Sequence, residues 1–205
     1  MTNRSTSVSS HKKNLRQLHR QRRRAFVGAQ RHKAEHDLVT YLIHALDPLI
    51  ANGRLRVIAG YDAFDGEANL EEFYQFLTRT YPHIKLAYPI HKNLQPLCFS
   101  TASSWSQKSS GFRFPQGHSI ELNQIDVILT PGVVFGSNGK RIGFGGGYYD
   151  RTFCLDAWRG IHFGVGFDFQ WDDFISDPWD IPLEGMLSNQ GWHEKSYTLS
   201  TFLSI

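Results

Sequence analysis

The chain has 205 residues and a mass of 23.5 kDa, of which 40% of residues are hydrophobic, 20% charged and 14% aromatic. This length and composition predict one globular domain with an adequate core, and they exclude collagen-like, coiled-coil, membrane-spanning and wholly disordered chains. The two cysteines, Cys98 and Cys154, form neither a CxxC nor a zinc motif. We therefore expect a protein of a reducing compartment, the cytoplasm.

The formal net charge of +3 conceals an uneven distribution. Residues 1–34 contain ten Lys/Arg and no acid, whereas residues 35–205 contain 12 basic and 19 acidic residues, a formal charge of −7. Such a basic segment is compatible with a nucleic-acid-binding arm, a targeting peptide or a helix that serves an anionic ligand. Residues 1–10 lack the apolar region of a secretory signal, and we expect them to form a disordered tail before a single domain, 11–205.

The basic segment predicts an amphipathic helix over His11–Phe26. Its apolar residues share one side at helical spacing, and they are Leu15, Leu18, Ala25 and Phe26. Lys12, Arg16 and Arg23 fall on the adjacent flank, with Lys12 and Arg16 one turn apart. The apolar side predicts that the helix docks on the domain. A solvated basic face is the simpler alternative for the flank.

A strand–helix–strand pattern follows. A leucine-rich helix ends at Asn52-Gly53, and a strand over 55–61, a helix capped by Asn69 and a strand over 84–89 come next. This βαβ order implies parallel strands joined by a right-handed crossover.

The second half of the chain repeats buried strands with a short helix between them. Strands are predicted over 125–130 and 161–167, with a helix that begins near Tyr148. The Ser-rich segment 100–111 and residues 168–192 are predicted to be irregular. The whole pattern predicts one α/β domain with a mostly parallel central sheet.

Thr130–Arg151 is the most informative segment. Four glycines lie between a buried strand and a helix start, and they are Gly143, Gly145, Gly146 and Gly147. Such glycines let backbone N–H groups approach a phosphate without Cβ clashes, and Lys140 and Arg141 could add contacts. The spacing matches neither GxGxxG nor a P-loop. The alternatives are an anion-binding loop and a tight turn required by strand–helix packing.

Two acidic residues could serve such a ligand. Asp150 follows the glycines, where it is either a Mg²⁺ ligand beside phosphates or a routine acid of a first helical turn. Glu67, in the Asp65-Gly66-Glu67 loop after a parallel strand, could accept ring N–H groups of a ligand or could simply open the next helix. The ten histidines show no zinc spacing, and no nucleophile motif is present. This favours catalysis by positioning and electrostatics on a phosphate-bearing cosubstrate.

The sequence TPGVVFGSNGKRIGFGGGYYDR, residues 130–151, resembles the signature of the 5-formyltetrahydrofolate cyclo-ligase family, also called methenyltetrahydrofolate synthetases. Four shorter segments resemble the family in the same order, and they are 12–16, 65–67, 88–89 and 179–183. The resemblance spans about residues 12–185. It implies a single three-layer α/β/α domain with the basic amphipathic helix at its N-terminus.

The resemblance also implies an activity, the ATP- and Mg²⁺-dependent cyclisation of 5-formyltetrahydrofolate to 5,10-methenyltetrahydrofolate with release of ADP and phosphate. The formyl oxygen attacks the γ-phosphate to give an imidate-like phosphate at N5, and N10 then attacks the activated carbon and expels phosphate. No protein nucleophile is expected. The implied partners are ATP and the folate, polyglutamylated or not, with no nucleic acid or membrane, and the chain is expected to be a monomer.

Carried over by position, the resemblance implies the site residues. ATP contacts fall to Lys12, Arg16, Arg141, Ile142, Gly143, Phe144, Gly145, Gly146, Gly147, Tyr148 and Tyr149. Substrate contacts fall to Asp62, Glu67, Phe144, Gly145, Gly146, Gly147 and Tyr148. The implied Mg²⁺ ligands are Asp150 and Asp180, and transition-state stabilisation falls to Arg141 and the Gly143–Gly147 loop.

Several positions depart from the family pattern. Phe114 stands where many members have Glu, Asp62 occupies an often apolar position, Trp179 replaces a His that often precedes the acid, and Leu183-Glu184 replaces Leu-Asp. These changes affect the folate half of the expected site more than the ATP half. They keep open a non-catalytic folate- or nucleotide-binding homologue, and the basic arm keeps open a nucleic-acid binder.

Overall fold

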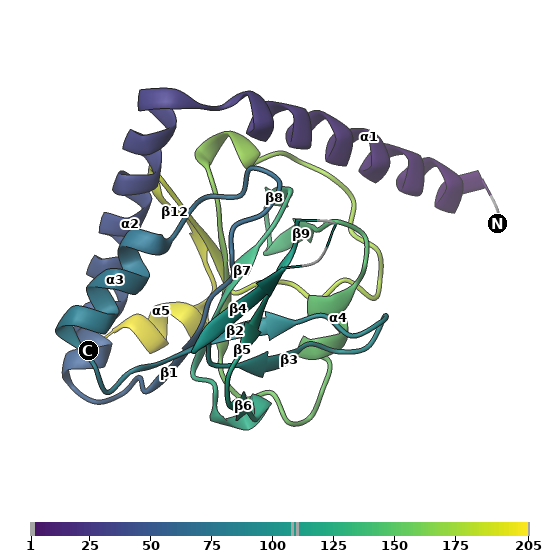
Figure 1. Ribbon diagram of the computed structural model, residues 1–205. Helices are drawn as coiled ribbons and strands as arrows, with labels where there is room; N and C mark the ends of the chain where they lie inside the picture. Colours follow the sequence, from purple (N-terminus) through teal and green to yellow (C-terminus); the bar gives the residue numbers. More distant parts are fainter. Residues whose placement is uncertain (1–2, 108, 110, 205) are drawn as a thin grey trace.

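Parallel strands form the centre of the molecule, as seen in a computed structural model that describes residues 3–107, 109 and 111–204 (Figure 1). The elements of the first half are α1 (Asn3–Ala25), α2 (Gly28–Ala51), β1 (Val57–Ala59), α3 (Glu71–Thr80), β2 (Lys85–Ile90), β3 (Cys98–Ser100), β4 (Ser104–Gln107), β5 (Arg113–Gln116) and β6 (Ser119–Ile120). Those of the second half are η1 (Leu122–Gln124), β7 (Val127–Pro131), β8 (Val134–Gly136), β9 (Lys140–Ile142), α4 (Tyr148–Phe153), β10 (Ile161–Val165), η2 (Asp168–Gln170), β11 (Gly185–Ser188), β12 (Gly191–Lys195) and α5 (Tyr197–Leu203).

The main sheet has the strand order β12-β11-β10-β7-β1-β2-β3-β6. Strands β11, β10, β7, β1 and β2 are mutually parallel, and the pairs toward both edges, β12 with β11 and β2-β3-β6, are antiparallel. Strand β1 has β2 on one side and β7 on the other. The strands that follow β1 directly in sequence are therefore added on one side of it, and β7, β10 and β11 are added on the other side, so the order of strand addition reverses between β1 and β7. In open α/β sheets, ligands bind beyond the carboxyl ends of the strands at such a point.

Helices cover both faces of the sheet, which confirms the predicted α/β class (Figure 1). Helices α2, α3 and α5 bury their apolar residues on one face, where Leu38, Leu42 and Phe73 are fully buried. Helix α4 lies on the other face and contributes Tyr149 and Phe153 to a second core. A fully buried strand such as β7 carries apolar residues on both sides because both faces are covered.

The N-terminal helix differs from the prediction in its start and in the face that it buries. Helix α1 begins at Asn3 rather than His11, so helix continues through most of the segment predicted to be a disordered tail, and residues 1–2 lie outside the described residues. The apolar side is not the docked side, because Leu18 is 49% exposed. The basic flank faces the domain instead.

The docked face of α1 is charged along its length. Lys12, His19 and Arg23 are buried on it, and Leu15 is the apolar residue among them. Their spacing of three or four residues places them on one side of a helix. His19 Nε2 lies 3.0 Å from Asp172 Oδ2, and Leu15 packs in a small core beneath the β8–β9 hairpin. Ion pairs and hydrogen bonds therefore attach this helix to the domain more than apolar contact does.

Other local predictions need correction. The Ser-rich segment 100–111 contains β4, which pairs with β5 in a hairpin, and residues 168–192 contain β11 and the start of β12. Short strands with many polar residues escape a hydrophobic pattern search. The cap of α3 is Leu70, although Asn69 Oδ1 does accept the backbone N–H of Glu71 at 2.9 Å. In the described part of the chain, no helix has the length and apolar character needed to cross a membrane.

Candidate functional site

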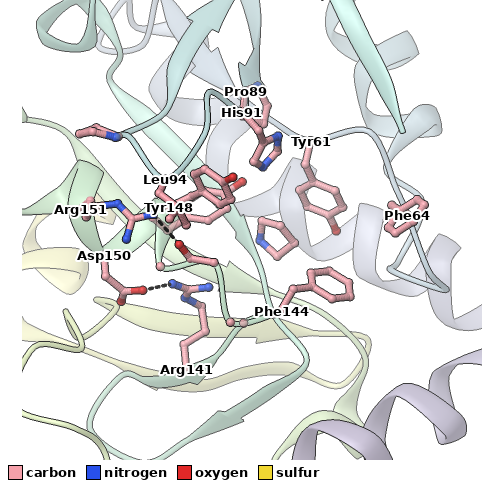
Figure 2. A pocket seen from close by; sticks show the side chains of 18 of the residues that line it. Tyr61, Phe64, Pro89, His91, Leu94, Arg141, Phe144, Tyr148, Asp150 and Arg151 are labelled. Atoms are coloured by element: carbon pink, nitrogen blue, oxygen red, sulfur yellow. Dashed lines mark hydrogen bonds and ion pairs between the residues drawn. The ribbon is translucent and has the colours of Figure 1, made fainter. Parts of the chain in front are cut away.

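A cavity of about 1370 Å³ opens at the carboxyl ends of β1, β2 and β7. Its walls come from α1, the loops after β1 and β2, the β4–β5 hairpin, the glycine loop before α4 and the segment around Asp180. This is the position that the strand order predicts for a ligand site. Figure 2 shows Arg141 and Asp150 facing each other on one side of the cavity, with Tyr61, Phe64 and Phe144 across from them.

Every site residue implied by the family resemblance lines this one cavity. From the phosphate-binding set these are Lys12, Arg16, Arg141, Ile142, Gly143, Phe144, Gly145, Gly146, Gly147, Tyr148 and Tyr149. From the folate and metal sets they are Asp62, Glu67, Asp150 and Asp180. The fold brings together residues separated by most of the chain length, whereas their individual roles remain predictions.

Two basic residues extend from α1 into the wall of the cavity. Arg16 Nε donates to the carbonyl oxygen of Gly143 at 2.8 Å, which ties the helix to the glycine loop. Lys12 Nζ donates to the carboxylates of Asp177 and Asp180, at 2.6 Å to Asp177. Asp177 also holds Asp180 in place, because its backbone N–H donates to Asp180 Oδ2 at 2.9 Å. The basic side chains of α1 therefore lie beside the carboxylates of Asp177 and Asp180 at this end of the cavity.

The glycine loop adopts backbone angles that favour glycine. Gly145 has φ 101° and Gly147 has φ 63°, both in the left-handed region. A Cβ on Gly146 would lie 2.6 Å from the ring of Tyr148, so that position is also restricted by a close approach. Arg151 Nη2 donates to the carbonyl oxygen of Gly146 and stabilises this conformation. The loop exposes backbone where a phosphate could approach.

Arg141 and Asp150 form a partly buried ion pair at the base of the loop. Arg141 Nη2 donates to Asp150 Oδ2 at 3.2 Å, and Asp150 Oδ1 accepts the backbone N–H of Ile181 at 3.3 Å. The Arg141 guanidinium also lies 5.2 Å from the ring centroid of Tyr149. Arg141 is thus fixed with its charge next to the glycine loop.

Glu67 is buried at the opposite end of the cavity. Its side chain accepts the backbone N–H of Phe64 at 3.0 Å, and the residue is only 6% exposed. Burial raises the pKa of Glu67 to about 7, against the opposing influence of Arg23 and the Phe64 N–H. A buried carboxylate with free acceptor capacity can bind N–H groups of a heterocycle.

Aromatic residues and one ion pair enclose the same end. The ring centroids of Phe64 and Phe112 lie 4.2 Å apart, and those of Phe64 and Phe144 lie 6.3 Å apart. Arg113 Nε donates to Asp62 Oδ2 at 2.8 Å, which fastens the β4–β5 hairpin to the loop after β1. The loop after β1 and the β4–β5 hairpin therefore give the cavity an aromatic side that includes the buried Glu67, whereas α1 and the glycine loop give it a side with cations and exposed backbone.

Two carboxylates near the glycine loop are candidate ligands for a metal ion. The described residues contain no group of three or more His, Cys, Asp or Glu side chains that could hold a metal by themselves. Mg²⁺ commonly binds one or two carboxylates together with phosphate oxygens and waters. Asp150 and Asp180 both line the cavity with incompletely buried carboxylates, the ligand type that such a Mg²⁺ requires, and each is paired with one cation, Arg141 or Lys12.

Sequence reasoning missed several residues around the cavity. Arg151 and Asp177 bond to the implied site residues Gly146 and Lys12, and the ring of His91 lies 4.8 Å from that of Tyr148. The guanidinium of Arg23 lies 5.4 Å from the ring centroid of Phe144. The helical pattern places Arg23 on the basic flank of α1 and gives no sign of this contact. Asp177 could have been found as an acid three positions before Asp180 in an irregular segment, which a turn would bring close to it.

The fold and the cavity define an α/β protein with a large cavity at the carboxyl edge of a parallel sheet. The model of the 5-formyltetrahydrofolate cyclo-ligase family matches residues 8–187. The chain is 32% identical to the 5-formyltetrahydrofolate cyclo-ligase of Haemophilus influenzae over 168 residues, 77% of this chain and 87% of that protein. It is 28% identical to that of Escherichia coli K12 over 181 residues, 82% and 95% of the two chains.

Solved structures agree with this similarity. The 5,10-methenyltetrahydrofolate synthetase of Mycoplasma pneumoniae superimposes with a TM-score of 0.74 at 27% identity, covering 87% of this chain and 98% of that one. The Aquifex aeolicus synthetase shares the fold, with a TM-score of 0.74 at 22% identity over 91% and 93% of the chains. The chain therefore belongs to the 5-formyltetrahydrofolate cyclo-ligase family, whose members are ligases.

Proposed function

We propose that this chain catalyses the ATP- and Mg²⁺-dependent conversion of 5-formyltetrahydrofolate to 5,10-methenyltetrahydrofolate, with release of ADP and phosphate. The observation that carries the proposal is the single cavity of about 1370 Å³ that joins the basic, glycine-lined end to the end containing Glu67. A nucleotide phosphate and a folate ring can meet in such a cavity, and membership of the family supports the same activity.

The basic end is proposed to bind the triphosphate of ATP. Lys12, Arg16 and Arg141 would contact phosphate oxygens, together with backbone N–H groups of Gly143–Gly147. Each of these side chains already has a fixed position through its contact with Asp180, Gly143 or Asp150. Preorganised charges of this kind stabilise negative charge that develops during phosphoryl transfer without a large reorganisation.

The opposite end is proposed to bind the folate. Glu67 would accept N–H groups of the pterin, and Asp62, Phe144 and Tyr148 would complete the wall around the ring system. The aromatic side chains exclude water from the formyl group, which limits hydrolysis of an activated intermediate.

The proposed reaction needs no protein nucleophile. The formyl oxygen attacks the γ-phosphorus, the bond to the β-phosphate oxygen breaks and ADP leaves. N10 then attacks the formyl carbon and loses its proton, and the C–O bond breaks as phosphate departs. Arg141 and the Gly143–Gly147 backbone would stabilise the charge on the transferred phosphoryl group. Asp150 and Asp180 would hold Mg²⁺, which neutralises phosphate charge when bound.

The alternatives receive less support from the site. Among the basic residues of α1, Lys12, Arg16 and Arg23 face the domain and bond to its groups, which leaves fewer of them to contact a nucleic-acid backbone. A non-catalytic homologue would retain ligand binding without turnover. We propose a monomer that acts in the reducing cytoplasm, where the free thiols of Cys98 and Cys154 would persist.

The test is to follow the absorbance of the methenyl-folate band with purified protein, 5-formyltetrahydrofolate and Mg²⁺, with and without ATP. An ATP-dependent rise, matched by equimolar release of ADP, supports the proposed activity. Binding of both ligands by folded protein without any absorbance change would instead establish a non-catalytic binder.

A further inference from the structure

Arg23 is the most completely buried charged residue near the site, yet it lies behind the cavity wall. The residue is 0% exposed. A buried guanidinium is retained only where hydrogen bonds and opposite charge compensate its desolvation. The hydrogen-bond partners of Arg23 therefore indicate its role in the structure.

The hydrogen bonds of Arg23 join the two loops on either side of the point where the order of strand addition reverses. Its Nη2 donates to the carbonyl oxygen of Asp65 at 2.8 Å, in the loop after β1. Its Nη1 donates to the carbonyl oxygen of Gly132 at 2.9 Å, directly after β7. One planar group thus bridges the carboxyl ends of neighbouring strands, where the cavity opens.

The loop that carries Glu67 packs directly on Arg23. Gly66 has φ 78°, and a Cβ there would lie 3.2 Å from the backbone carbonyl of Arg23, so the loop approaches helix α1 as closely as glycine allows. Arg31 secures the same loop from α2, with Nη2 donating to the carbonyl oxygen of Glu67 at 2.7 Å. The backbone on both sides of Glu67 is thereby fixed.

Several charged or titratable groups face Glu67. Arg23 from α1 favours its charged form, and Arg31 from α2 donates to its backbone carbonyl oxygen. Asp62 and Asp65 lie in the same loop, where Asp62 pairs with Arg113 of β5 and Asp65 pairs with Arg20 and Arg24 of α1. Tyr61 and Tyr149 lie at the end of β1 and on α4. Since the two aspartates oppose ionisation of Glu67, the nearby guanidinium favours its charged form. Arg23 therefore fixes the backbone that precedes Glu67, and its positive charge favours the ionised form of the side chain that would accept pterin N–H groups.

We infer that Arg23 is a positioning residue that orients the loop of Glu67 for folate binding through its hydrogen bonds to Asp65 and Gly132, an inference that rests on the proposed function. Arg23 acts from the same helix as Lys12 and Arg16, which serve the ATP end. A change at Arg23 that merely loosened α1 would weaken ATP and folate binding together. A change that acts through Glu67 weakens folate binding alone and alters its pH dependence.

The test measures the dissociation constants of 5-formyltetrahydrofolate and of ATP separately, by calorimetry across pH 5.5 to 9, for the full chain and its variants. In the wild-type chain we expect folate affinity to fall as pH drops through about 7, because burial raises the pKa of Glu67 to that value. In Arg23→Gln the midpoint of this fall moves up by about one pH unit, and folate affinity at neutral pH drops about tenfold. ATP affinity stays within about twofold.

Two further variants keep the outcome decisive. Arg22→Gln removes the same charge from an exposed position of α1 and leaves both affinities and the midpoint unchanged. Arg23→Lys retains the charge but loses the planar arrangement of hydrogen-bond donors. We expect this variant to bind folate more weakly than the wild type, with an unchanged pH midpoint. It also provides the test if Arg23→Gln does not fold.

Loss of ATP affinity together with folate affinity in either Arg23 variant overturns the inference. So does a pH midpoint of folate binding that stays at the wild-type value in Arg23→Gln or that shifts in Arg23→Lys. A wild-type chain that binds no 5-formyltetrahydrofolate at any pH contradicts the proposed function itself, and the inference with it.

Discussion

Arg16 on the N-terminal helix donates from Nε to the carbonyl oxygen of Gly143, 127 positions later in the chain, at 2.8 Å. This hydrogen bond connects the docked face of α1 to the first glycine of the loop before α4. The remaining guanidinium nitrogens stay beside the cavity, which Arg16 lines. One residue therefore fixes the loop and presents positive charge to whatever the loop binds.

Replacement of Arg16 by alanine is expected to raise the KM for ATP while the chain stays folded. Loss of one charge-assisted phosphate contact typically costs about 1.5–3 kcal/mol, roughly a ten- to 150-fold change. The KM for the folate should change far less, because Arg16 lies at the other end of the cavity. Lys13→Ala, an exposed residue of the same helix, is the matched control. Unchanged ATP kinetics in Arg16→Ala would remove this residue from the phosphate site.

Lys12→Ala is expected to raise the ATP requirement by a different route. Lys12 Nζ now separates the carboxylates of Asp177 and Asp180, and its removal leaves two like charges facing the incoming phosphates. We expect the KM for ATP to rise about tenfold and to fall back partly in Lys12→Arg, since arginine restores the charge. Steady-state kinetics at saturating folate, with the ATP concentration varied, measure the KM for ATP of both variants. Equal kinetics for Lys12→Ala and wild type would contradict the role.

Much of the site could be predicted from local sequence because its strongest signal is local. The glycines at 143–147 and Asp150 share one short segment, and the left-handed angles of Gly145 and Gly147 are a direct reason for glycine there. The βαβ order likewise placed Glu67 at the carboxyl edge of the sheet. These features depend on neighbours in sequence, which a pattern can show.

The features that the sequence did not predict are contacts between segments far apart in the chain. An apolar stripe predicted the docked face of α1, yet the buried side carries Lys12, His19 and Arg23, because the surface beneath it offers acids and carbonyl oxygens. A helix wheel ranks faces by hydrophobicity and contains no information about that surface. The ion pair of Lys12 with Asp177, 165 positions apart, has the same origin.

Asp150→Asn is expected to weaken the dependence of activity on Mg²⁺. A neutral amide is a poorer ligand for this cation than a carboxylate, so half-maximal activity should require roughly tenfold more Mg²⁺. The same change leaves Arg141 without its anionic partner. A Mg²⁺ titration at fixed ATP makes the comparison, with Asp156→Asn as an exposed acid outside the cavity. A superimposable titration would exclude Asp150 as a ligand.

Gly145→Ala tests whether the loop conformation itself matters. A Cβ at Gly145 would meet no atom closer than 3.8 Å, so the substitution is not blocked by a clash. Its φ of 101° is strained for any residue with a side chain, at a cost of about 1–2 kcal/mol. We expect ATP affinity to fall about tenfold as the loop relaxes, with a small loss of thermal stability. Wild-type ATP binding by this variant would show that another part of the cavity holds the phosphates.

Glu184 lies away from the cavity and should affect stability without affecting catalysis. Burial raises the pKa of this half-buried carboxyl to about 7, and its Oε2 has no hydrogen-bond partner. Because the folded-state pKa exceeds the unfolded value, the folded chain binds more protons between pH 4.5 and about 7, and its free energy of unfolding falls as pH rises through that window. Above it, the folded chain contains a charged, poorly solvated carboxylate.

Glu184→Gln should therefore match the wild type near pH 5 and exceed it in stability at pH 8, since the amide keeps the shape and never ionises. Urea denaturation at the two pH values measures this difference directly, with Asp156→Asn as the exposed-acid control. The kinetic constants should stay at wild-type values because Glu184 contacts β10 and the start of α5 through its backbone, to His162 and Ser196. A variant less stable than wild type at pH 8 would mean that the ionised carboxylate stabilises the fold.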